Sequence, residues 1–102
     1  MSRYIEAYKS YNKNKQGEKF WGFYTTENNL VMDAVQRILF GRVFDYGFEV
    51  LTIKEARNQF NLYKDMLDCF NGETRQQIIN SFEKLFSEAD KFGVNRLLFK
   101  LG

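Results

Sequence analysis

The chain has 102 residues, of which 44% are hydrophobic and 27% charged, and its formal net charge is +2. This balance is typical of one folded domain and excludes an intrinsically disordered chain, so we predict a single compact domain over residues 1–102. The chain contains no histidine, which excludes Ser-His-Asp and Cys-His catalytic groups and imidazole-bound zinc. Phosphate-loop, CxxC and HExxH motifs are also absent, so we predict no catalytic residue, no metal site and no cofactor.

Cys69 is the only cysteine, so no disulfide can form within the chain. It has no histidine to deprotonate it, and we expect a small buried hydrophobe instead of a nucleophile. Neither a secretory leader nor an apolar run near the roughly 18 residues of a membrane span is recognised. These features predict a cytoplasmic protein with no membrane partner.

The N-terminal quarter is compatible with two structures. Three tyrosines spaced four and three residues apart would share one face of a short helix: Tyr4, Tyr8 and Tyr11. Alternatively, residues 3–11 and 19–25 form the arms of a β-hairpin, joined by the polar stretch 12–18. The sequence leaves the choice between helix and strand open for residues 3–11.

A helix is predicted over residues 27–40, capped by Thr25 or Thr26 and followed by a glycine. Its apolar face contains six residues at helical spacing: Leu30, Val31, Ala34, Val35, Ile38 and Leu39. Asp33 and Arg37 stand in the order in which an acidic and a basic residue four apart stabilise a helix. We therefore expect an ion pair between them.

Residues 44–50 alternate between apolar and polar side chains, the pattern of a half-buried strand. Because a strand is not stable alone, it needs a partner, either residues 20–24 or the C-terminal stretch 94–101. The sequence therefore predicts a small antiparallel sheet.

Two helices are predicted between residues 53 and 92. Thr52 and Glu55 form the pattern of a capping box. The first helix carries an apolar seam with a 3.5-residue period: Ile53, Ala56, Phe60, Tyr63, Leu67 and Phe70. A second apolar flank comprises Leu62, Met66 and Cys69, and we expect it to contact another element or a second copy of the chain.

Asn71 and Gly72 are predicted to end this helix, because glycine tolerates the left-handed C′ conformation. Thr74 begins the next helix, which ends at Gly93. Its seam alternates steps of four and three: Ile78, Phe82, Leu85, Ala89 and Phe92. Two such helices with a short connection form an antiparallel αα-hairpin. The predicted fold is therefore helix-dominated α+β, with the hairpin and the 27–40 helix packed on the sheet; the alternative is an all-α bundle.

The basic residues concentrate near the N-terminus. Residues 1–24 carry five basic and two acidic side chains, whereas the remaining residues carry ten basic and eleven acidic ones. Residues 8–24 contain both aromatic side chains and lysines, and such rings stack on unpaired bases while lysines neutralise phosphates. Arg42, after a helix end, is a further candidate contact. The candidate binding residues are Tyr11, Lys13, Lys15, Lys19, Trp21 and Arg42.

Trp21 is also a candidate anchor for a protein interface, because rigid aromatic side chains dominate such contacts. With catalytic groups missing, we predict a non-enzymatic protein that docks on a protein or nucleoprotein partner. In general build the chain resembles the small accessory and inhibitor proteins of phages and mobile elements. The alternative function is single-stranded nucleic-acid binding through residues 8–24.

Overall fold

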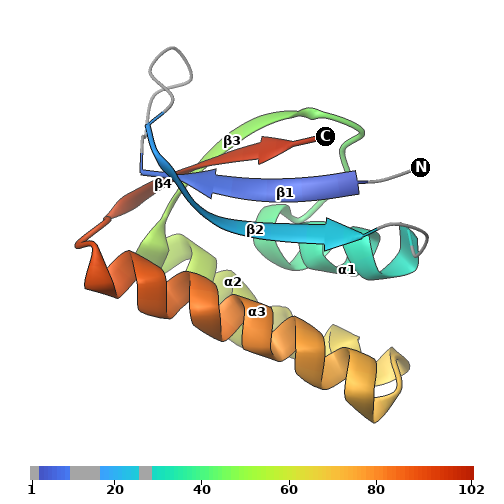
Figure 1. Cartoon of the computed structure of the whole chain (residues 1–102). Coiled ribbons are helices and arrows are strands. Elements are labelled where there is room, and N and C mark those ends of the chain that lie inside the picture. The colour runs from blue at the N-terminus through green and yellow to red at the C-terminus, as the bar shows by residue number, and fades with distance from the viewer. Residues whose placement is uncertain (1–2, 10–16, 26–28) are drawn as a thin grey trace.

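The computed structural model describes residues 3–9, 17–25 and 29–102 and is a mixed α+β domain (Figure 1). The helices and the antiparallel sheet predicted from the sequence are confirmed, and the all-α alternative is wrong. The strands are β1 Arg3–Tyr8, β2 Lys19–Thr25, β3 Gly47–Thr52 and β4 Arg96–Leu101. The helices are α1 Asn29–Phe40, α2 Ile53–Tyr63, the 3-10 helix η1 Lys64–Cys69 and α3 Gly72–Lys91.

The four strands have the order β2-β1-β4-β3, and every neighbouring pair is antiparallel. The strand interpretation of the N-terminus is therefore correct for β1 and β2, which form the two arms of a hairpin. Most of the predicted turn, residues 10–16, lies outside the described residues, and so does the proposed contact residue Tyr11. The C-terminal strand β4 lies between β1 and β3.

The strand predicted over residues 44–50 begins later, at Gly47, and takes the C-terminal candidate β4 as its partner. Gly47, the first residue of β3, has a φ of 141°, a conformation that side chains disfavour, so glycine suits this position. Phe44 instead packs edge-on against Phe40, with 6.0 Å between ring centroids. Tyr46 is exposed.

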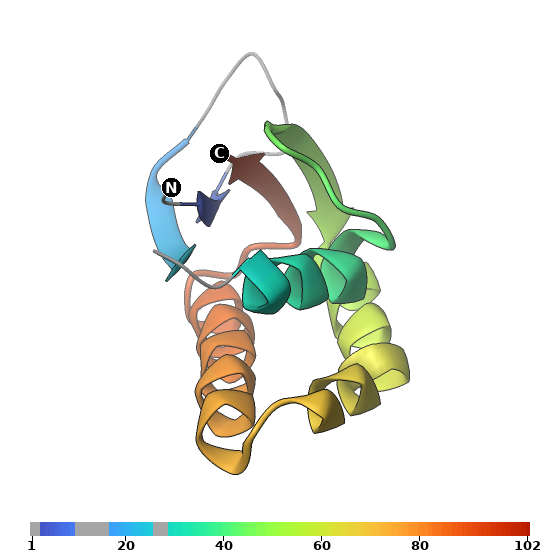
Figure 2. The ribbon, with the colours of Figure 1, turned by 90° about the vertical axis from the view of Figure 1, so that its right-hand side faces the viewer.

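All three α-helices lie on one side of the sheet (Figure 2). Helix α1 contacts β1, β2, α2 and η1, which explains why it is buried on more sides than its predicted apolar face. Met32 and Gln36 are buried in addition to that face, whereas Leu30 is 72% exposed, so its predicted burial is wrong. The residues 27–28 proposed to begin this helix lie outside the described part of the chain, and Thr25 belongs to β2.

Two contacts from outside α1 explain its polar residues. Gln36 accepts a hydrogen bond at 2.6 Å from the backbone N–H of Phe44 through Oε1, which satisfies its buried amide oxygen. Asp33 forms an ion pair with Arg3 at 2.9 Å, and Arg3 also donates to the carbonyl of Phe44 at 2.8 Å. Asp33 therefore pairs with Arg3 of β1. The pair with Arg37 that helical spacing predicted does not form.

Helices α2 and α3 run antiparallel, as their contacts demonstrate. Phe60 stacks on Phe82 with ring centroids 4.6 Å apart, and Arg57 near the start of α2 pairs with Asp90 near the end of α3. The capping box at the start of α2 is confirmed, since Thr52 Oγ1 accepts from the Glu55 N–H at 3.1 Å and Glu55 accepts from the Thr52 N–H at 3.1 Å.

The end of the first helix differs from the prediction. The α-helix stops at Tyr63 and continues as η1, which leaves Tyr63 half-exposed and Cys69 exposed, so the predicted burial of Cys69 is wrong. Gly72 does not end this helix. It begins α3, and Asn71 caps α3 by accepting from the Thr74 N–H at 2.8 Å. The asparagine that resembled a stop is thus a start.

Within the described residues, no helix combines the length and the apolar character that a membrane crossing needs.

Candidate functional site

One face of the sheet carries the helices, and none of the described helices lies on the other (Figures 1 and 2). Alternate residues of each strand point to this second face. We call it the outer face, and its side-chain positions are Tyr4, Glu6, Tyr8, Lys19, Gly22, Tyr24, Phe48, Val50, Leu98 and Lys100. Tyr8 and Leu98 oppose each other across β1 and β4; both are buried, yet neither belongs to the main core. They are therefore a small apolar centre of the outer face.

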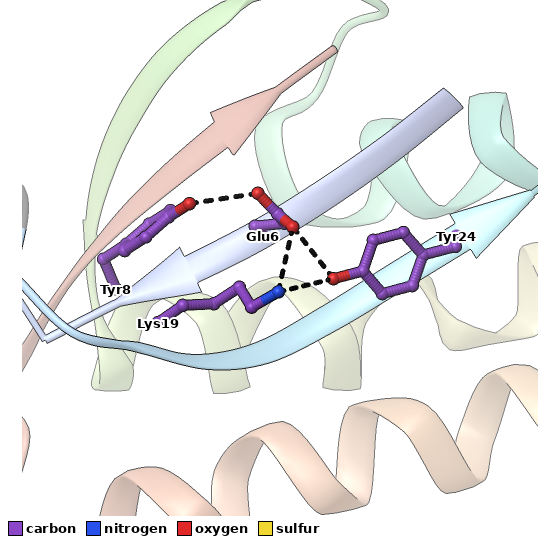
Figure 3. Close-up of polar contacts among 4 residues, drawn as sticks. All are labelled: Glu6, Tyr8, Lys19 and Tyr24. Atoms are coloured by element: carbon purple, nitrogen blue, oxygen red, sulfur yellow. Dashed lines mark hydrogen bonds and ion pairs between the residues drawn. The ribbon is translucent and has the colours of Figure 1, made fainter. Parts of the chain in front are cut away.

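Four polar side chains meet on this face in a cluster around Glu6 (Figure 3). Tyr8 donates its hydroxyl to Glu6 Oε1 at 3.0 Å, and Tyr24 donates to Glu6 Oε2 at 2.9 Å. Lys19 Nζ lies 3.3 Å from Glu6 Oε2 and 3.2 Å from the Tyr24 hydroxyl. We call these residues the Glu6 cluster. Three donors converge on one carboxylate and link β1 to β2.

Burial and hydrogen bonds shift the pKa values of three members of the cluster: Glu6, Tyr8 and Lys19. Burial alone raises the pKa of Glu6, but the bonds from Tyr24, Tyr8 and Lys19 outweigh it, so that pKa lies below its ordinary 4.5. Burial and the bond to the Glu6 carboxylate raise the pKa of Tyr8 above 10.0. Bonds to Tyr24 and Glu6 raise the pKa of Lys19 above 10.5. At neutral pH the cluster therefore contains an anion, a cation and a protonated Tyr8.

A β-bulge brings Lys19 to this face. Lys19 and Tyr24 are five residues apart, so in a regular strand their side chains would point to opposite faces. The register between β1 and β2 shifts between Ala7 and Tyr8, which places Lys19 opposite Tyr8 and leaves Phe20 without a direct partner. The extra residue reverses the alternation, and Lys19 joins Tyr24 and Glu6.

Two glycines make room for tyrosine rings on the outer face. A Cβ atom on Gly22 would lie 2.4 Å from the Tyr24 hydroxyl oxygen, and one on Gly102 would lie 2.4 Å from Tyr4 Cζ. The hydroxyl ends of both rings therefore occupy the space where a side chain would stand. The two ring centroids lie 6.4 Å apart. Gly22 thus allows the Tyr24 ring to pass over its position and reach Glu6 on the neighbouring strand β1.

The accessible part of the outer face is amphipathic. The Tyr24 residue is 57% exposed and the Lys19 side chain 49% exposed, while Phe48, Val50 and Lys100 are half-buried. Tyrosine presents an apolar ring together with a polar tip, and such side chains are enriched at protein interfaces. The face therefore combines the chemistry of a contact surface with a rigid hydrogen-bonded support.

The structure separates the residues predicted to form one binding site. Lys19 lies on the outer face, whereas Trp21 points to the core and is only 4% exposed. The indole N–H of Trp21 donates to the carbonyl of Ser81 at 2.9 Å. Its predicted role as a surface anchor is therefore corrected to a core role. Lys13 and Lys15 lie outside the described residues.

Arg42 lies away from the outer face. It pairs with Glu49 at 3.4 Å and packs over the Phe44 ring, with its guanidinium carbon 4.3 Å from the centroid. The Glu49 position points to the helix side of β3, since Glu49 is opposite Phe99 of the core. Arg42 and Lys19 are therefore parts of two different surfaces.

Sequence reasoning missed Glu6, although it is the centre of the cluster. The signal that could have identified it is the two-residue spacing of Tyr4, Glu6 and Tyr8, which predicts a strand face with a carboxylate between two phenols. The contribution of Lys19 depends on the bulge and that of Lys100 on the position of β4, and no local pattern reveals either.

Among the described residues, no three His, Cys, Asp or Glu side chains gather in a way that would hold a metal ion. No family model, curated protein or solved structure matches the chain.

Proposed function

We propose that the chain is a small cytoplasmic binding protein, and not an enzyme, that docks on a protein or nucleoprotein partner through the outer face of its sheet. The observation that carries this proposal is the Glu6 cluster on a sheet face without a described helix. A surface of fixed tyrosines and paired charges gives shape and charge complementarity with little loss of side-chain entropy on binding. An accessory or inhibitor protein that acts by covering part of a larger assembly needs such a surface.

Charge on the outer face favours a protein partner over bare nucleic acid. Lys19 already contacts the Glu6 carboxylate, and the lowered pKa of Glu6 keeps that carboxylate ionised at neutral pH. A phosphate approaching Lys19 would meet this negative charge, whereas an arginine or backbone N–H of a protein could use it as an acceptor.

Single-stranded nucleic acid is the second candidate partner. The observation that favours it is the exposed Tyr24 ring beside Lys19, because exposed rings stack on bases and lysines neutralise phosphates. Binding of fluorescent oligo-dT and oligo-U at increasing salt distinguishes the two candidates. Affinity for an oligonucleotide that falls steeply with salt would support the second candidate, and absence of binding at low salt would remove it.

Affinity capture with two tyrosine variants tests the first candidate. Tyr24→Ala removes an exposed ring from the outer face, and Tyr46→Ala removes a still more exposed ring from the loop before β3. We expect wild type and Tyr46→Ala to retain the same protein from an extract of the producing cells after nuclease treatment, and Tyr24→Ala to lose it. Thermal unfolding of both variants verifies that each is folded.

Loss of the partner in Tyr24→Ala alone supports docking through the outer face. Equal retention of the partner by both variants contradicts docking through the outer face. If nuclease treatment releases the partner from the wild type, the assignment moves to nucleic acid.

A further inference from the structure

Strand β3 lies at one edge of the sheet, and no described strand pairs with its outer side. The N–H of Ile53 donates to the carbonyl of Asn95 at 2.8 Å, which continues the β3–β4 register. Because hydrogen-bonded and non-bonded pairs alternate in an antiparallel ladder, Glu49 and Leu51 direct their backbone groups toward β4. Phe48 and Val50 therefore direct theirs away from the sheet, and no described residue forms a hydrogen bond with them.

A hollow of about 230 Å³ adjoins this edge on the helix side of the sheet. Its lining comes from the end of α1 and the loop after it, from β3 and from α2: Leu39, Phe40, Arg42, Glu49, Leu51, Glu55 and Gln59. A cavity of about 150 Å³ accommodates benzene, so the hollow has room for one large side chain. The lining is mixed: three residues contribute apolar groups, and the other four contribute charged or polar ones.

We propose that β3 accepts an extended peptide segment of a partner protein as a fifth strand. Main-chain hydrogen bonds would form with Phe48 and Val50, and alternate peptide side chains would point to the helix side. There one side chain of the peptide occupies the hollow, in the manner of strand addition at a sheet edge with side-chain pockets for specificity.

The charges beside the hollow indicate an acidic residue in the peptide. The two carboxylates that line the hollow already have partners, since Glu49 pairs with Arg42 and Glu55 accepts from the Thr52 N–H.

A second hollow shares Gln59 with the first and is lined by Arg37, Gly41, Tyr63 and Met66. Arg37 is exposed and has no ion pair with a described residue. A peptide carboxylate two residues from the side chain in the first hollow points to the same side of the strand, toward Arg37.

A second copy of the chain is the competing occupant of this edge. Antiparallel pairing of two β3 strands about Glu49 would place two carboxylates directly opposite each other, which is destabilising, whereas pairing about Phe48 or Val50 would not. The other edge strand, β2, carries a bulge next to Phe20, a feature that interrupts regular pairing. The β3 edge is regular along its whole pairing with β4.

A display library of random decapeptides, selected on the immobilised wild-type chain, provides the probe. Val50→Pro is the diagnostic variant, because it removes an N–H that points away from β4 and leaves the β3–β4 ladder complete. Val50→Thr is its control, because it keeps both the N–H and a β-branched side chain. We expect Val50→Pro to weaken binding of the selected peptides by about tenfold or more and Val50→Thr to leave it within about twofold.

Hydrogen exchange of the wild type gives a second readout that does not depend on the variant. The amides of Phe48 and Val50 should become protected when a selected peptide binds. The proposal is overturned if no peptide is selected, if Val50→Pro binds as well as wild type, or if these two amides remain unprotected. It is also overturned if sedimentation shows that the wild type is a dimer and that Val50→Pro is a monomer, because the edge is then occupied by a second copy. The test separates this proposal from docking through the outer face: Tyr24→Ala leaves the backbone edge unchanged, and Val50→Thr changes an outer-face side chain but keeps the N–H.

Discussion

The hydroxyl of Tyr24 donates to Glu6 Oε2 at 2.9 Å across the β1–β2 pair, although the residue directly opposite Glu6 is Gly22. Tyr24 reaches the carboxylate diagonally because Gly22 has no side chain to block its ring. Tyr8 and Lys19 complete the contacts of the same carboxylate. The outer face is therefore held in one arrangement by contacts that converge on Glu6.

Replacing Glu6 with Gln should destabilise the fold by about 1–2 kcal/mol, because hydrogen bonds to a charged group are stronger than those to an amide. Urea unfolding monitored by circular dichroism measures the change. Glu83→Gln is the matched control, since Glu83 is exposed on α3, and it should alter stability by less than about 0.5 kcal/mol. Equal effects of the two substitutions would argue against the cluster as a structural support.

The contribution of Glu6 should depend on pH in a defined direction. Its pKa is lower in the folded chain than the ordinary 4.5, so the folded state favours the ionised form. The stabilisation is therefore complete above 4.5 and is lost as the pH falls through the lowered folded pKa. Urea unfolding over a pH series should show the stability gap between wild type and Glu6→Gln narrowing in this acidic range. A gap that stays constant would contradict the assignment.

Trp21→Phe should lower stability by about 1–2 kcal/mol, because it removes buried volume and the hydrogen bond to the Ser81 carbonyl. Circular dichroism during urea unfolding measures this change, since the variant lacks tryptophan fluorescence. In the wild type the emission of the buried indole should shift to longer wavelength on unfolding. Partner binding should survive in folded Trp21→Phe; its selective loss would return Trp21 to the contact surface.

Thr52→Ala should cost about 1 kcal/mol, because Thr52 caps α2 through the Glu55 N–H. The same unfolding measurement applies. Ser87→Ala is a suitable comparison, because Ser87 is exposed in the interior of α3, where alanine favours the helix. A stability loss in Ser87→Ala as large as that in Thr52→Ala would show that the capping box is unimportant.

Local patterns predicted the helices well. The capping box at Thr52 and the buried seam of Ile78, Phe82 and Leu85 follow from contacts within one or two turns. The end of the first helix was wrong because Asn71 precedes a glycine that suits a helix stop, yet its side chain caps the next helix. A helix stop and a helix N-cap favour the same residue types, and only tertiary packing decides which of the two forms.

The candidate site was less accessible to sequence reasoning. The candidate residues included both Lys19 and Trp21, two positions that a regular strand places on the same face. The bulge between them separates the two: Trp21 enters the core, and Lys19 reaches the outer face. The contribution of β4 to this face depends on its insertion beside β1, a long-range pairing that no local spacing encodes.

Photo-crosslinking from a single position tests the central claim most directly. A photoreactive benzoyl-phenylalanine replaces Tyr24 in one preparation and Tyr46 in another, and both are irradiated in the producing cells. Contact through the outer face predicts a nuclease-resistant protein adduct from position 24 and none from position 46. An adduct from position 46 alone, a nuclease-sensitive adduct, or no adduct from position 24 would contradict it.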